Sequence, residues 1–141
     1  MRVGVVRGTV AAGLAGLGLV GGAAAVTYKD DGSAEVTVTN TQGHVEKVTI
    51  SGSGGKTFSC PVGTDSKLEP IDVRAGRIKI TVRHVEKSLS ILEERYPDNR
   101  APHNVVVRYN RLVARDKRLV KAFNAAIAEH NAVLDSDCEP S

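Results

Sequence analysis

A repeat of seven residues, running from Tyr109 to Ser136, constrains the fold of this chain more than any other feature. Split into sevens, the segment reads YNRLVAR, DKRLVKA, FNAAIAE and HNAVLDS. The fourth and fifth places are apolar in every repeat, which predicts a long amphipathic helix. A strict seven-residue period favours packing against a second helix. Because Tyr109 and Phe123 widen the apolar stripe, we expect this helix to meet more than one neighbour.

A partner for this helix precedes it in the chain. Apolar residues recur there at steps of three and four, which predicts a second amphipathic helix: Leu68, Ile71, Ala75, Ile78, Val82, Val85, Leu89, Leu92 and Tyr96. The connection from Pro97 to Pro102 is rich in turn-forming residues. We therefore expect an antiparallel helical hairpin.

Two details of the first helix follow from the sequence. Ser66-Lys67-Leu68-Glu69 matches a capping box, which predicts a start near Ser66 and puts Pro70 in the first turn. An alternative remains for residues 77–82, because Ile78, Ile80 and Val82 also alternate at period two, as in a strand. The helical spacing that continues to Tyr96 favours the helix.

The two cysteines fit the hairpin. If the turn centres near Asn99, residues equally far from it along the chain face one another. Cys60 and Cys138 are equally far from Asn99 and flank the two predicted helices. We predict a disulfide between them at the open end of the hairpin. In the chain-entropy model such a long closed loop is worth about 4 kcal/mol.

Asp116 interrupts the apolar first place of the repeat. The same antiparallel arrangement puts it opposite Val82 and Arg83, with His84 adjacent. A buried charge without a partner would cost several kcal/mol. We therefore predict an ion pair from Asp116 to Arg83 or His84, with a solvent-directed Asp116 side chain as the alternative.

The first 27 residues have the composition of an export leader. Arg2 and Arg7 precede an uncharged run from Thr9 to Val26 that consists mostly of Ala, Gly, Leu and Val. Ala23-Ala24-Ala25 fits a signal-peptide cleavage site. Residues 8–26 are also long enough for a membrane anchor. Both interpretations place the rest of the protein outside the cytoplasm, either secreted or anchored in the cytoplasmic membrane.

Residues 28–60 have a β pattern. Ala34, Val36 and Val38 alternate with polar residues, as do Val48 and Ile50 after the Thr41-Gln42-Gly43 segment. A three-residue loop there puts Val36 opposite Val48 and makes Gly43 the left-handed residue. We expect this hairpin to pack on the helices or to gain a third strand from residues 56–60, beyond a flexible glycine- and serine-rich loop at residues 51–55.

Sequence motifs for catalysis or ligand binding are weak. Gly54-Gly55-Lys56-Thr57 resembles part of a phosphate-binding loop, but Ile50 occupies the position where the motif requires its first glycine. The four histidines have no metal-ligand spacing on one helix face, and both cysteines are assigned to the disulfide. We predict no catalytic residue, no cofactor and no metal. His130 is expected to be a packed, hydrogen-bonded core residue.

Polar residues of the second helix suggest two surfaces. Asn110, Asn124 and Asn131 share one place in the repeat with Lys117, as a solvated flank or a recognition face. A basic patch that could face an anionic partner comprises Arg108, Arg111, Arg115, Arg118 and Lys121. The chain's net charge of +3, about +1 without Arg2 and Arg7, is too small to indicate nucleic-acid binding.

The sequence therefore predicts an α+β protein, mainly α, in three parts: a leader or transmembrane helix (1–27), a short β-hairpin (28–60) and a disulfide-closed helical hairpin (61–141). We expect a non-enzymatic structural or interaction protein of the cell envelope. The alternative is a membrane-tethered accessory subunit that docks its helical stripe on a larger complex. A hydrolase would need Glu and His side chains to converge in a cleft. The partner and the oligomeric state do not follow from the sequence.

Overall fold

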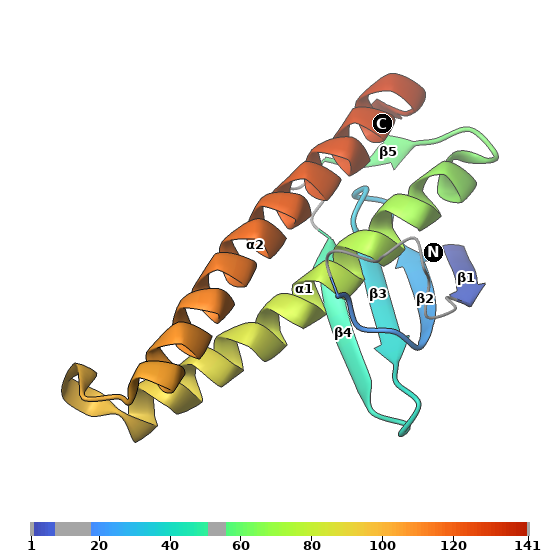
Figure 1. Ribbon diagram of the computed structural model, residues 1–141. Helices are drawn as coiled ribbons and strands as arrows, with labels where there is room; N and C mark the ends of the chain where they lie inside the picture. The colour runs from blue at the N-terminus through green and yellow to red at the C-terminus, as the bar shows by residue number, and fades with distance from the viewer. Residues whose placement is uncertain (1, 8–17, 51–55, 141) are drawn as a thin grey trace.

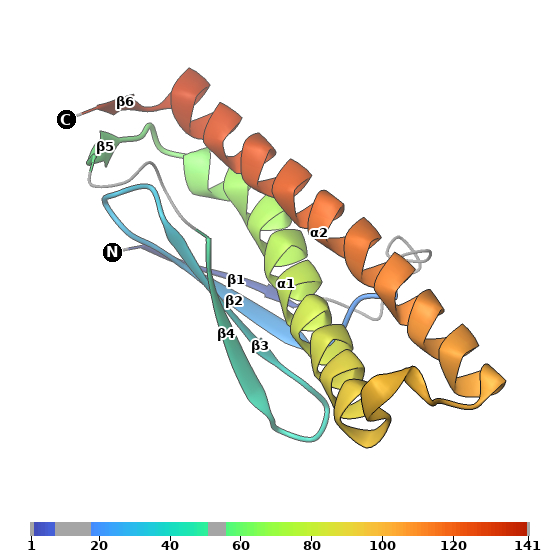
Figure 2. The ribbon, with the colours of Figure 1, turned by 90° about the vertical axis from the view of Figure 1, so that its left-hand side faces the viewer.

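The computed structural model describes residues 2–7, 18–50 and 56–140, and only the backbone of residues 2–7 and Asn99. The elements follow in the order β1 (Arg2–Arg7), β2 (Ala23–Tyr28), β3 (Ala34–Thr39), β4 (Val45–Ile50), β5 (Phe58–Ser59), α1 (Thr64–Arg95), the short 3-10 helix η2 (Pro97–Asn99), α2 (His103–Asp137) and β6 (Glu139–Pro140). The sheet, α1 and α2 form three successive layers, with α1 in the middle (Figures 1 and 2).

The helical hairpin is confirmed. α1 and α2 are antiparallel and pack along their length, and their turn end projects past the sheet (Figures 1 and 2). Residues 77–82 are helical, as the continuous apolar spacing favoured. Pro102 lies at the N-cap of α2, where its carbonyl accepts hydrogen bonds from the backbone amides of Val105 and Val106.

The start of α1 differs from the prediction. The helix begins at Thr64, two residues before Ser66, and its N-cap is Gly63, which has a φ of 96° and offers no side chain for capping. Ser66 is therefore already inside the helix, and the capping box is not used. Pro70 lies within the helix rather than in its first turn.

The β-hairpin of β3 and β4 is confirmed together with its register. Val36 pairs with Val48 and Ala34 pairs with Ile50. Gly43 has a φ of 83° in the three-residue loop, and the amide of Asn40 donates to the carbonyl of His44 across it. The alternation of small or branched apolar residues with polar ones therefore specified which face of these strands is buried.

The third strand of the sheet does not come from residues 56–60. It is β2, which pairs antiparallel with β3, and β1 adds a fourth strand beyond it. Residues Phe58–Ser59 instead pair with Glu139–Pro140 as a separate two-stranded sheet at the open end of the hairpin. The glycine- and serine-rich loop predicted at residues 51–55 lies outside the described residues.

The prediction of a transmembrane leader is not supported. Its last part, residues 23–27, lies in β2 (Ala23–Tyr28), in which Ala24 and Val26 are buried in the core. Within the described chain, no helix combines the length and apolar composition that a membrane span requires. Residues 8–17 of the predicted span lie outside the described residues. A short run of Ala and Val suits an export leader and a buried strand equally well, so the sequence pattern did not separate them.

The core lies between the sheet and the hairpin. The inward side chains of β2, β3 and β4 pack with Leu68, Val73, Ala75 and Ile80 of α1 and with Ala126 and Leu134 of α2. Gly76 of α1 lies directly over Val36, where a β-carbon added to the glycine would come within 2.5 Å of a valine methyl group. A glycine at this position therefore lets α1 approach the sheet closely.

Candidate functional site

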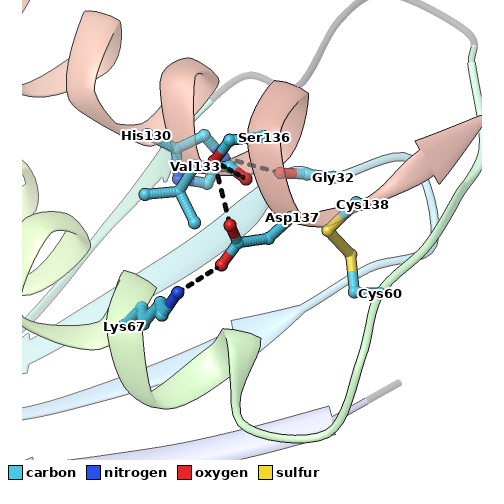
Figure 3. The surroundings of a disulfide bond; sticks show 8 residues. All are labelled: Gly32, Cys60, Lys67, His130, Val133, Ser136, Asp137 and Cys138. Carbon is cyan, nitrogen blue, oxygen red and sulfur yellow. Dashed lines mark hydrogen bonds and ion pairs between the residues drawn. A yellow bond between two sulfur atoms is a disulfide. The ribbon is translucent and has the colours of Figure 1, made fainter.

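The predicted disulfide between Cys60 and Cys138 is present and closes the open end of the hairpin (Figure 3). It joins residues 78 positions apart, which in the chain-entropy model is worth about 4 kcal/mol. Such a bond is typical of an oxidising compartment and thus points to an extracytoplasmic location. Next to it, Nζ of Lys67 donates to Oδ2 of Asp137 at 2.7 Å, which ties α1 to α2 and lowers the pKa of Asp137 (Figure 3).

A buried polar cluster lies further inside, between the two helices and the turn after β2. Nδ1 of His130 on α2 is 2.6 Å from Oδ1 of Asp72 on α1. Nε2 of the same ring is 2.7 Å from the carbonyl oxygen of Gly32 (Figure 3). Both side chains have no solvent exposure. The pair therefore joins three separate parts of the chain inside the core.

The geometry of the cluster determines its charge. A carbonyl only accepts, so Nε2 of His130 carries a proton, and Nδ1 faces a carboxylate. Burial lowers the pKa of His130, but the hydrogen bond and negative charge of Asp72, together with the Gly32 carbonyl, raise it above the usual value. These contacts favour the charged form of the His130 ring, as in a buried imidazolium–carboxylate pair.

Tyr28 completes the surroundings of this pair. Its hydroxyl lies beside the Asp72 side chain, and both the hydroxyl and Oδ2 of Asp72 are buried. Burial, followed by the negative charge of Asp72, raises the pKa of Tyr28. Solvent reaches neither His130 nor Asp72, so this cluster links the layers inside the core and is not open to a ligand from solvent.

Sequence reasoning identified only half of this pair. His130 was expected to be a hydrogen-bonded core residue, and the structure confirms it. Asp72 was missed, although its position contained a signal: it lies four residues after Leu68 and three before Ala75, both on the buried face of α1. A charged residue at that place in a helix requires a buried partner.

The predicted ion pair of Asp116 with Arg83 or His84 does not form. Arg83 donates to the carbonyl of Lys47 at 2.8 Å, and Nε2 of His84 lies 2.9 Å from Oε2 of Glu46, so both face β4 rather than α2. Oδ1 of Asp116 is buried without a hydrogen-bond partner in the described chain. Counting from the turn gives the level of a residue along the hairpin, but not the direction in which its side chain leaves the helix.

A polar hollow lies where α1 meets the β3–β4 turn. It has a volume of about 550 Å³ and is lined by Asn40, His44, Val45, Glu46, Arg83, His84 and Lys87. The His84 and Glu46 side chains are 54% and 37% exposed, so their contact is a surface interaction of small energetic value. Five of its lining side chains are ionisable.

A second hollow, of about 370 Å³, lies between the helices at the turn end of the hairpin. It is mainly apolar, with a lining that includes Leu92, Tyr96, Val105 and Val106. The Tyr109 hydroxyl at its edge donates to Oε1 of Glu93 at 2.7 Å, and this hydrogen bond raises the pKa of Tyr109.

The segment that precedes β2 is held by polar side chains of both helices. Arg77, which is 2% exposed, donates to the carbonyls of Val20 and Gly22. The Thr81 hydroxyl accepts from the amide of Val20, and Arg115 donates to the carbonyl of Gly18 at 2.8 Å. Val20 and Gly22 thus provide acceptors for a buried guanidinium, and three side chains of the helices bind residues 18–22.

The predicted basic patch is distributed along the N-terminal half of α2. Arg108, Arg111, Arg118 and Lys121 are exposed, and Arg115 is partly covered by its contact with Gly18. Among the described residues, no carboxylate lies within ion-pair distance of these five side chains. Asn110 and Asn124 are also exposed, whereas Asn131 is half-buried.

The comparisons with known proteins give no further indication. No protein-family model, no curated protein and no solved structure matches the chain. Within the described residues, no group of three His, Cys, Asp or Glu side chains is placed to hold a metal ion. The candidate sites therefore rest on the geometry of this chain alone.

Proposed function

We propose that the protein is a non-enzymatic interaction module of the cell envelope, outside the cytoplasm, and that α2 presents its binding surface. The observation that carries this proposal is the unequal burial of the two helices. Fourteen of the 32 residues of α1 are buried, against only Leu119, Ala126, His130 and Leu134 among the 35 of α2. A helix so long and so little covered leaves most of its circumference available to a partner.

One flank of α2 has the pattern of a helix-binding seam. Val106, Val113 and Val120 recur at seven-residue intervals, and Val106 and Val120 are each 39% exposed. Asn110, Lys117 and Asn124 occupy the intervening positions of the same flank. We call this flank the valine flank. β-Branched residues with interspersed Asn or Lys are typical of seams that select one partner and one register.

The partner that fits the valine flank is an amphipathic helix. The sequence predicted an apolar stripe too wide for a single neighbour, and α1 covers only part of it. The remaining part would be covered by another envelope protein. If that protein belongs to a larger assembly, the chain acts as an accessory subunit, which is the alternative form of the same proposal.

A specific observation also supports an enzymatic rival. His44, Glu46 and His84 line one hollow, so a hydrolytic function would have to use these residues. A structural role of Glu46 and His84 weighs against a hydrolytic function, because their contact joins β4 to α1 at the surface. The two functions are separate if substitutions in the valine flank abolish partner binding while substitutions of His44, Glu46 or His84 leave it unchanged.

The proposal is tested by capture from the envelope of the natural host. A tagged full-length chain is compared with a Val106→Asp/Val120→Asp double variant, in which both substituted residues are already partly exposed. Val62→Asp is the matched control, because Val62 is fully exposed and lies outside α2. We expect a defined partner that the double variant retains at least about tenfold less and the control retains fully. Equal capture by the double variant would exclude the valine flank.

A further inference from the structure

We infer that the arginine residues on the other side of α2 form a binding surface for anionic phospholipid headgroups. Arg108, Arg111, Arg115 and Arg118 are spaced by three and four residues, so they follow one side of the helix over about 15 Å. We call these four residues the arginine side. Arg115 follows Val106 by about two and a half turns, which places the arginine side opposite the valine flank.

The charge distribution of the chain supports an anionic partner here. The segment from Arg108 to Lys121 contains six Lys and Arg residues and only one acidic residue, Asp116, which gives it a net charge of +5. The entire chain has a net charge of +3, so the remainder is net negative. The net positive charge of the chain therefore lies on this half of α2, and four of the six cations there belong to the arginine side. An anionic surface would attract it in a fixed orientation.

Three of the four guanidinium groups are free to bind, and Arg115 already donates to the carbonyl of Gly18. Arg108, Arg111 and Arg118 are exposed, and none lies within ion-pair distance of a carboxylate in the described chain. Their planar donors can bind phosphate oxygens in pairs, as phospholipid headgroups allow. The helix also projects past the sheet towards its N-terminal end, so a flat surface can approach this half (Figures 1 and 2).

The shape of the arginine side favours a membrane over a soluble polyanion. Four basic side chains in a line of about 15 Å can meet a flat anionic surface together. Arg115 is held on this side of the helix by its hydrogen bond to the carbonyl of Gly18.

The test measures sedimentation of the full-length, disulfide-bonded chain with vesicles of phosphatidylcholine alone and of phosphatidylcholine with phosphatidylglycerol. We expect binding that requires phosphatidylglycerol and weakens as salt shortens the range of the charges. Each cation near an anionic surface contributes about a factor of five. The Arg108→Gln/Arg111→Gln/Arg118→Gln variant should therefore bind about 100-fold more weakly.

A control variant carries the same change of net charge elsewhere. Lys29, Lys56 and Arg74 are exposed and lie outside α2, so their replacement by Gln should leave vesicle binding within about twofold of the original. An equal loss in this control, or binding that does not depend on phosphatidylglycerol, would overturn the inference. Inorganic polyphosphate bound as tightly as the vesicles would assign the arginine side to a soluble polyanion instead.

The two surfaces can be tested separately. The arginine variant leaves the valine flank intact, and the Val106→Asp/Val120→Asp variant leaves the arginine side intact. Failure of vesicle binding would therefore not affect capture of a protein partner, and failure of capture would not affect vesicle binding.

Discussion

Asp72→Asn is the substitution that most directly tests how the three layers are held together. It keeps the shape of the side chain but removes the negative charge that faces His130 in the core. A buried imidazolium without a counterion is strongly disfavoured, so His130 loses a proton and one of its two ring nitrogens can no longer donate. Breaking a buried pair in this way costs about 3–5 kcal/mol. This is a large share of the roughly 5–15 kcal/mol that stabilises a typical domain.

The same substitution should reverse the pH dependence of stability. In the unmodified protein the pKa of His130 is raised, mainly by Asp72 acting against burial. The stabilisation from the charged ring is thus complete below the unfolded-state value of about 6.5 and is lost as the pH rises through the folded-state value. Without Asp72, burial lowers the pKa of His130, so the variant should become more stable as the pH rises.

Urea denaturation between pH 5 and 8.5, followed by circular dichroism with the disulfide intact, measures both effects. Glu46→Gln is the matched control, because it breaks the His84–Glu46 ion pair at the surface. We expect the control to lose less than about 1 kcal/mol. If Asp72→Asn lowers the free energy of unfolding no more than the control does, the assignment of a buried ion pair is refuted. Parallel pH profiles of stability in the variant and the unmodified protein would refute it as well.

Three further predictions concern the packing, the disulfide and the N-terminal segment. Gly76→Ala should destabilise the protein by about 1–3 kcal/mol in urea, despite the better helix propensity of alanine, because the new methyl group meets Val36; a gain in stability would show that α1 is not held so close to the sheet. Replacing Cys60 and Cys138 by Ala should lower the free energy of unfolding by about 4 kcal/mol, and an unchanged urea midpoint would contradict the role of the bond. A chain that lacks residues 1–25 should unfold at clearly lower urea concentration than one that lacks residues 1–17, because it loses the carbonyls bound by Arg77 and part of β2; equal midpoints would remove β2 from the stable fold.

The elements that could be read from the sequence are those specified by local periodicity. The heptads of α2 and the matching spacing in α1 predicted the hairpin. This spacing puts the apolar residues of each helix on one side, so the two apolar sides can pack together. The distance of Cys60 and Cys138 from the turn predicted the disulfide, because an antiparallel hairpin fixes levels along its axis. The β3–β4 register followed from alternation and from Gly43.

The tertiary structure decided what local patterns leave open. An alanine- and valine-rich run is apolar both in an export leader and in a buried strand. Residues 18–28 belong to the body because β2 pairs with one edge of β3 and because buried Arg77 donates to the carbonyls of Val20 and Gly22. The partners of Asp72, His130, Arg83 and His84 depend on the rotation of each helix about its axis and on the approach of the sheet. Sequence spacing fixes positions within one element, whereas the pairing of charges depends on distances between elements, which only the packed core sets.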